Sequence, residues 1–168
     1  MIGDVSSPGI GRLFAACCLA ALAGVAAAQP VMPELPMPGE IGKDVMWIPS
    51  DDVMVTRMLD AARVTSRDYL VDLGSGDGRI VIAAALRGAR ALGVEYNAEL
   101  VAYARARASR SGLSGRARFV HGDMFRTDLF RASVITLFLL EENNLKLRPR
   151  LLGLRPGTRI VSNSFAMG

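Results

Sequence analysis

One stretch of the sequence carries residues whose types and spacing could bind a nucleotide-like ligand. The apolar run 69–73 leads into glycines at alternate positions, Gly74, Gly76 and Gly78, and a second apolar run follows. A buried strand that turns through glycines into a helix has this pattern. Glycine lets the backbone pass close to a ligand, and the start of the following helix directs free N–H groups into the same space.

Glycine spacing and two carboxylates narrow the choice of ligand. A dinucleotide fingerprint reads G-x-G-x-x-G, whereas this loop reads G-x-G-x-G and Asp72 stands two residues before its first glycine. An anion there would repel a pyrophosphate and favour a cationic ligand. Glu95 ends a second apolar run, 91–95, about twenty residues beyond the loop, where a carboxylate can accept hydrogen bonds from both ribose hydroxyls.

These residues resemble those of a known family. The stretch Val71 to Gly78 is similar to motif I of the class I S-adenosylmethionine-dependent methyltransferases. The segments Asp-Leu-Gly-Ser-Gly-Asp-Gly-Arg-Ile-Val-Ile, Gly-Val-Glu-Tyr-Asn and Asn-Leu-Lys-Leu-Arg-Pro-Arg-Leu resemble the small protein-lysine methyltransferases related to the ATP synthase c-subunit and adenine nucleotide translocase enzymes. The resemblance spans Trp47 to Gly168. It implies S-adenosyl-L-methionine as cofactor and a protein lysine as methyl acceptor, with a small-molecule acceptor left open.

The same resemblance implies roles for particular residues. Asp123 would receive the adenine amino group after the third strand, and the backbone N–H of Met124 would meet the adenine ring. Glu141 and Asn143 follow the fourth strand and are candidates for contact with the methyl acceptor. The predicted cofactor-binding set is Asp72, Gly74, Ser75, Gly76, Gly78, Glu95, Asp123 and Met124.

The expected architecture is an α/β doubly wound, mostly parallel Rossmann-like sheet that lacks the last two strands of the family fold. Apolar runs predict strands at 69–73, 91–95, 118–121, 133–139 and 158–165. Helical periodicity predicts helices at 51–62, 80–87 and 98–110 and a last one through residue 151. The arginines of the third helix, Arg105, Arg107 and Arg110, are expected to form a solvated face.

The first residues are predicted to lie outside this fold. Residues 1–28 resemble a signal peptide, with Arg12 before an uncharged apolar run that ends in three alanines. A Pro-rich linker, 29–44, and a methyltransferase domain, 45–168, would follow. The protein is therefore expected to be periplasmic or secreted, or, if the segment is uncleaved, membrane-anchored. Trp47 would pack under the first helix or close the pocket.

Composition limits the partners. Both cysteines lie in the predicted signal peptide and the chain has a single histidine, His121, so no Cys-based or His-rich metal site is expected. The net charge of +4 is spread along the sequence, which predicts no nucleic-acid partner. The leading hypothesis, which the resemblance implies, is methyl transfer from S-adenosylmethionine to a neutral lysine without a dedicated base. The alternatives are an NAD(P)-binding oxidoreductase and a non-catalytic S-adenosylmethionine-binding protein.

Overall fold

The computed structural model describes residues 31–35, 37 and 49–166. The predicted signal peptide 1–28, Trp47 and most of the predicted linker lie outside these residues. Within them, no helix is long and apolar enough to cross a membrane.

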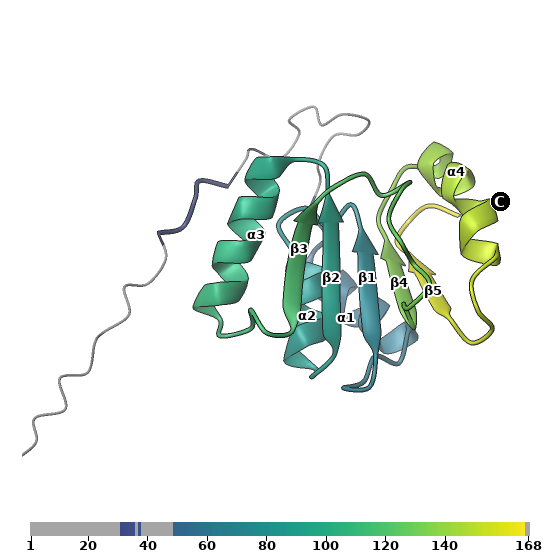
Figure 1. Ribbon diagram of the computed structural model, residues 1–168, viewed down its shortest axis with the longest axis horizontal. Coiled ribbons are helices and arrows are strands. Elements are labelled where there is room, and N and C mark those ends of the chain that lie inside the picture. Colours follow the sequence, from purple (N-terminus) through teal and green to yellow (C-terminus); the bar gives the residue numbers. More distant parts are fainter. Residues whose placement is uncertain (1–30, 36, 38–48, 167–168) are drawn as a thin grey trace, which may run out of the picture.

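Five parallel strands form one sheet (Figure 1). Their order is β3-β2-β1-β4-β5, so β1 lies at the centre and the order reverses between β1 and β4. The strands are β1 Tyr69–Leu73, β2 Arg90–Glu95, β3 Ala117–His121, β4 Val134–Leu137 and β5 Arg159–Ser162. The helices are α1 Asp52–Ala61, α2 Arg79–Leu86, α3 Ala98–Arg110 and α4 Glu141–Leu152. The predicted doubly wound Rossmann-like class is confirmed.

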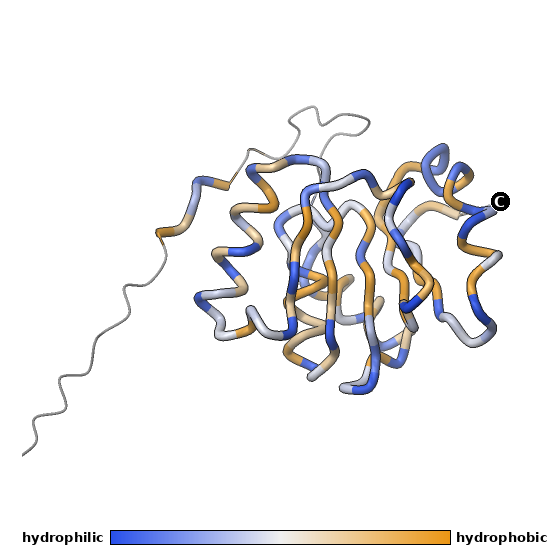
Figure 2. The backbone as a smooth tube through the Cα atoms, viewed as in Figure 1, coloured by the Kyte–Doolittle hydropathy of each residue, from blue (hydrophilic) through white to orange (hydrophobic). Residues whose placement is uncertain are grey.

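Two hydrophobic clusters cover the two faces of the sheet. On one face, Leu70 and Phe119 pack with the apolar sides of α1, α2 and α3. On the other, Val71 and Ile135 pack with Leu147 of α4 and with the segment that joins β3 to β4. Figure 2 shows the resulting concentration of hydrophobic residues along the inner strands. Because β1 and β4 are buried on both faces, they read in sequence as continuous apolar runs.

Local signals position the helices. The carboxylate of Asp51 accepts the Met54 N–H at 2.7 Å and caps α1, as its residue type predicts. The side chain of Asn97 caps α3 in the same way, through Glu99 N at 2.8 Å and Leu100 N at 3.3 Å. Gly78 precedes α2 with a φ of 81°, a conformation that glycine adopts without strain.

Two strands are shorter than predicted. β4 begins after Ser133, whose side chain oxygen accepts the Tyr69 N–H at 3.0 Å and whose hydroxyl donates to Asp68 at 2.8 Å. β5 ends at Ser162, because the chain turns at Ser164, which has a φ of 64°. The left-handed Ser164 therefore ends β5 inside a run that hydropathy alone assigns to a strand, whereas Ser133 continues to bond β1 and β5 through its backbone.

Candidate cofactor and active site

The glycine loop is held against the end of β2. The N–H groups of Gly74 and Ser75 both donate to the carbonyl of Val94, at 2.9 and 3.0 Å. Gly74, Gly76 and Gly78 have φ values of 79°, 52° and 81°, a left-handed conformation that disfavours other residues. The loop therefore lies at the carboxyl ends of β1 and β2, beside the point where the strand order reverses. Open α/β sheets bind ligands at this point.

Glu95 lies directly beside this loop. One carboxylate oxygen accepts the Gly76 N–H at 2.9 Å, and the other accepts the Asn97 N–H at 2.8 Å. A carboxylate has about four acceptor positions, so each oxygen retains a lone pair for a ligand hydroxyl. The two backbone bonds fix the orientation of the carboxylate before any ligand arrives.

Asp72 is a buried carboxylate at the end of β1. It accepts the hydroxyl of Thr136, its register partner on β4, at 2.7 Å. Burial, helped by the charges of Glu95 and Asp77 and opposed by the Thr136 hydrogen bond, raises the pKa of Asp72 to about 7. A cation placed beside Asp72 would lower this pKa again. The site therefore favours a positively charged group.

Two small residues in and near the loop serve packing. A Cβ atom on Gly78 would lie 2.6 Å from the Phe119 ring and 2.8 Å from the Ala104 side chain. A Cβ atom on Gly93 would lie 2.5 Å from the Ser75 hydroxyl oxygen, which has no hydrogen-bond partner among the described residues. The Ser75 side chain therefore fills the space above Gly93, while its backbone N–H donates to the Val94 carbonyl and its carbonyl accepts the Gly78 N–H at 2.9 Å.

Sequence reasoning missed Asp77, a residue of the loop that is held by two ion pairs. Asp77 is buried and forms ion pairs with Arg79 at 2.8 Å and with Arg107 of α3 at 3.0 Å. Arg79 also donates to the carbonyl of Ser50, just before α1. The short Asp77–Arg79 spacing could have indicated one pair, but no local signal indicates Arg107, thirty positions away.

The predicted solvated arginine face of α3 holds for Arg105 and Arg110, which are both exposed, whereas Arg107 is half-buried. Arg107 binds Asp77, and Arg105 donates two hydrogen bonds to the carbonyl of Phe119 on β3, at 3.0 and 2.7 Å. Arg110 alone is exposed without such a contact among the described residues. Long arginine side chains reach neighbouring elements that a helical wheel does not show.

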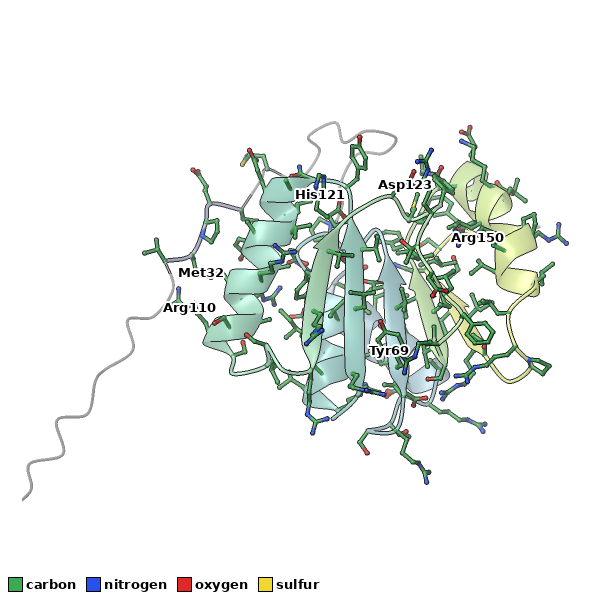
Figure 3. The ribbon with its side chains drawn as sticks, viewed as in Figure 1. Met32, Tyr69, Arg110, His121, Asp123 and Arg150 are labelled. Atoms are coloured by element: carbon green, nitrogen blue, oxygen red, sulfur yellow. The ribbon has the colours of Figure 1, made fainter. Side chains whose placement is uncertain are left out.

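The predicted adenine side lies at the same end of the sheet (Figure 3). The carboxylate of Asp123 accepts the Phe125 N–H at 2.8 Å and lies 3.8 Å from the Arg126 guanidinium. Met124 is partly buried and packs against the second hydrophobic cluster. His121 ends β3, and its ring contacts Tyr96 at a centroid distance of 5.9 Å.

The two acceptor-side candidates differ in exposure. Glu141 is exposed at the first residue of α4, whereas Asn143 is 4% exposed. Leu139, which lies just before this helix, packs against the glycine loop. A Cβ atom added to Gly74 would lie 2.9 Å from the Leu139 side chain. The neighbouring Asn144 is fully buried, and its amide donates to Ser162 Oγ at 3.2 Å and to the Phe165 carbonyl at 3.1 Å.

The described residues fit S-adenosylmethionine better than a phosphate-containing cofactor. Asp72 and Glu95 form no ion pair with any described residue, whereas Arg79 and Arg107 are already paired with Asp77. A sulfonium and an ammonium suit this charge, and Glu95 retains acceptor capacity for ribose hydroxyls. In the same part of the chain, no group of three His, Cys, Asp or Glu side chains is arranged to hold a metal.

Comparison with known proteins identifies the family. Residues 72–168 match the ANTKMT methyltransferase domain. The chain belongs to this family. A protein-lysine N-methyltransferase of Saccharolobus islandicus is 44% identical over 124 residues, covering 72% of this chain and 77% of the relative. The ATP synthase c-subunit lysine N-methyltransferase of Caenorhabditis elegans is 39% identical over 116 residues, covering 67% of this chain.

A solved structure supports the same conclusion. An RNA methyltransferase from Salinibacter ruber, in complex with S-adenosyl-L-homocysteine, is 48% identical with a TM-score of 0.70, covering 72% of this chain and 80% of that one. S-adenosylmethionine is accordingly the cofactor of this methyltransferase domain. The chain spans 61% of the nematode ATP synthase methyltransferase and 43% of its human counterpart.

Proposed function

We propose that the protein transfers a methyl group from S-adenosylmethionine to the side-chain amine of a protein lysine. The observation that carries this proposal is the family match, together with a glycine loop flanked by two oriented carboxylates. The relatives from Saccharolobus and Caenorhabditis are both lysine N-methyltransferases. Neither the NAD(P) oxidoreductase nor the non-catalytic alternative gains support from these relatives.

Under this proposal the predicted cofactor residues contact different parts of the cofactor. Glu95 binds the ribose hydroxyls through its remaining lone pairs, and Asp72 lies nearest the cationic groups. Asp123 and Met124 receive the adenine. Gly74, Gly76 and Gly78 keep the loop backbone close to the ligand, and Ser75 holds the shape of the loop through its backbone hydrogen bonds to Val94 and Gly78.

The cofactor supplies a methyl carbon that its sulfonium makes electrophilic. The protein's task is then to hold the acceptor nitrogen in line with that carbon and to exclude water. A lysine must enter neutral, and an environment with little water lowers its pKa. Glu141 and Asn143 closely follow Leu139, whose side chain packs against the glycine loop. They are the candidates for positioning the amine. No residue is required to act as a strong base, because the proton can leave after transfer.

The test is transfer of a labelled methyl group to total cellular protein and RNA. We expect label in a protease-sensitive, RNase-resistant fraction and methyl-lysine after acid hydrolysis. Label in RNA would show instead the acceptor class for which the Salinibacter protein is described. A Glu95→Ala variant provides the control for transfer that depends on this site.

We also propose that residues 1–28 direct export, with a membrane-anchored form if the segment is retained. The support is the sequence pattern of Arg12, an apolar run and three alanines. The measurement is cell fractionation of the C-terminally tagged chain, followed by sequencing of its N-terminus. A soluble cytoplasmic protein that still begins at Met1 would contradict export.

A further inference from the structure

A concave surface lies at the other end of the sheet from the glycine loop. Tyr69, one of its lining residues, lies at the opposite end of the strands from His121 and Asp123 (Figure 3). This groove has a volume of about 770 Å³. Its charged lining consists of Arg67, Arg90, Arg116, Arg118, Arg131 and Arg155. We call it the arginine groove.

The parallel sheet gathers these arginines from distant parts of the sequence. Arg90 is the first residue of β2, and Arg118 is the second residue of β3. Arg67, Arg131 and Arg155 each lie shortly before β1, β4 or β5. Because all five strands are parallel, their starts meet at one edge. A basic charge that is dispersed in the sequence is therefore concentrated in space.

Most of these guanidinium groups have no partner among the residues that the structure describes. The side chain of Arg116 donates to the Gly88 carbonyl at 2.7 Å, and that of Arg155 lies 3.5 Å from two carbonyl oxygens. The other four side chains form no hydrogen bond or ion pair with any described residue. Within the same part of the chain, the groove lining contains no aspartate or glutamate. An uncompensated cluster of this kind attracts an anionic partner.

The groove also offers apolar surface between the charges. Tyr69 and Leu92 are partly buried at the groove, and Phe130 is 76% exposed at its rim. Such a mixed lining suits an extended polypeptide, in which side chains on one side recur about every 7 Å. Carboxylates can then bind arginines in a bidentate manner while apolar side chains contact Leu92 and Phe130. A concave surface fits a single chain better than it fits the flat surface of a membrane.

We propose that the arginine groove binds an extended acidic segment of the protein substrate, an inference that rests on the proposed protein acceptor. The five residues of β1 separate the groove from the glycine loop by roughly 13 Å. An extended segment of about five residues spans that distance. The acidic segment therefore lies at least that far in sequence from the lysine that enters the site. Two contacts on one substrate increase its effective concentration at the catalytic edge.

The first test measures binding without methyl donor. The probe is a short fluorescein-labelled peptide of alternating glutamate and leucine, followed by fluorescence anisotropy. The groove variant carries Arg90→Gln, Arg118→Gln and Arg131→Gln, and none of these side chains bonds to another described residue. The matched control carries Arg57→Gln, Arg110→Gln and Arg148→Gln, which change the net charge equally at exposed helix positions.

We expect the groove variant to lose about tenfold or more in peptide affinity, because charge-assisted bonds are lost, and the control variant to retain affinity. The glutamine–leucine version of the peptide should not bind. Equal losses in both variants would show attraction by net charge alone and would overturn the proposal. Tighter binding of oligouridylate or of anionic vesicles than of the peptide would also overturn it.

The second test separates this inference from the proposed function. The substrate is a peptide whose lysine is joined to the same acidic stretch by a neutral spacer of about six residues. We expect the groove variant to raise KM with unchanged kcat and unchanged cofactor affinity. A protein that binds the acidic probe in its groove but methylates no lysine would overturn the proposed function and retain the groove. Methylation that does not depend on the acidic stretch would overturn the groove inference and retain the proposed function.

Discussion

The two ends of the sheet differ in how their charged side chains are paired. At the carboxyl ends of the strands, Asp72, Asp77 and Glu95 surround the glycine loop, and each already accepts hydrogen bonds or ion pairs. At the amino ends, the groove arginines are mostly unpaired among the described residues. A parallel sheet separates strand starts from strand ends, so bonded carboxylates gather at one edge and mostly unpaired arginines at the other. The net charge of +4 conceals this arrangement.

The separation is large enough for the two ends to act independently. A strand of five residues is roughly 13–17 Å long, which exceeds the Debye length of about 8 Å at physiological ionic strength. Exposed charges at one edge are therefore largely screened from ligands at the other. Substitutions at the carboxyl edge should change cofactor binding alone, and those at the amino edge should leave it unchanged.

The largest effect is expected from Gly76→Val. Gly76 has a φ of 52° and donates its N–H to Glu95, and a β-branched residue is strongly disfavoured in that conformation. We expect S-adenosylmethionine binding to be abolished in calorimetry. Gly157→Ala is the control, because Gly157 also has a positive φ but has nothing within 4 Å of its added Cβ. Equal cofactor affinity in both variants would refute the role of the loop.

Asp72→Asn should have the next largest effect. Removing one partner of a buried charge pair costs about 3–5 kcal/mol, so we expect cofactor affinity at pH 8 to fall by at least about a hundredfold. In the wild-type protein, affinity should also weaken as the pH falls below 7, because Asp72 takes up a proton near its pKa of about 7. The variant should lose that pH dependence. Calorimetry between pH 5.5 and 8 measures both.

The same substitution should stabilise the cofactor-free protein. The pKa of Asp72 is raised from 3.8 to about 7, so between these values the folded state binds more protons than the unfolded state. The free energy of unfolding therefore decreases as pH rises through this window. Asp72→Asn removes this term, and we expect a gain on the order of a few kcal/mol at pH 8 that vanishes near pH 4. Urea denaturation of the variant and wild type would show it; equal stability at both pH values would contradict it.

Glu95→Ala should weaken cofactor binding by about 1.5–3 kcal/mol, the range for hydrogen bonds to a charged group. Glu99→Ala, at an exposed position of α3, is the matched control and should bind normally. If the Glu95 variant folds and retains full affinity, Glu95 does not bind the ribose.

The smallest effect is expected from Arg107→Gln. This substitution removes one of two cationic partners of the buried Asp77, while Arg79 remains. We expect a loss of stability of about 1 kcal/mol, the upper part of the range for partly exposed ion pairs. Arg110→Gln on the same helix should be neutral. A thermal melt distinguishes them, and identical melting temperatures would show that Arg79 alone satisfies Asp77.

Local sequence signals predicted most of the fold and the position of the loop. The alternating glycines, the caps Asp51 and Asn97 and the apolar runs act within a few residues, so they are readable without the tertiary structure. Asp77–Arg107 and Asp68–Arg159 are not, because folding alone brings these distant residues together. The arginine groove is only partly predictable from the sequence. Its members occur near strand starts, but their gathering becomes visible only once the strands are known to be parallel.

The hydrogen bonds from Arg105 to Phe119 have a consequence for association between molecules. β3 is an edge strand, paired with β2 alone among the described strands. An edge with free carbonyl and N–H groups is a template for another chain, and natural proteins block such edges to avoid aggregation. The Arg105 guanidinium occupies the Phe119 carbonyl, and Arg118 adds a charge to the same strand. Arg105 therefore leaves one acceptor fewer on this edge for the backbone of another chain to pair with.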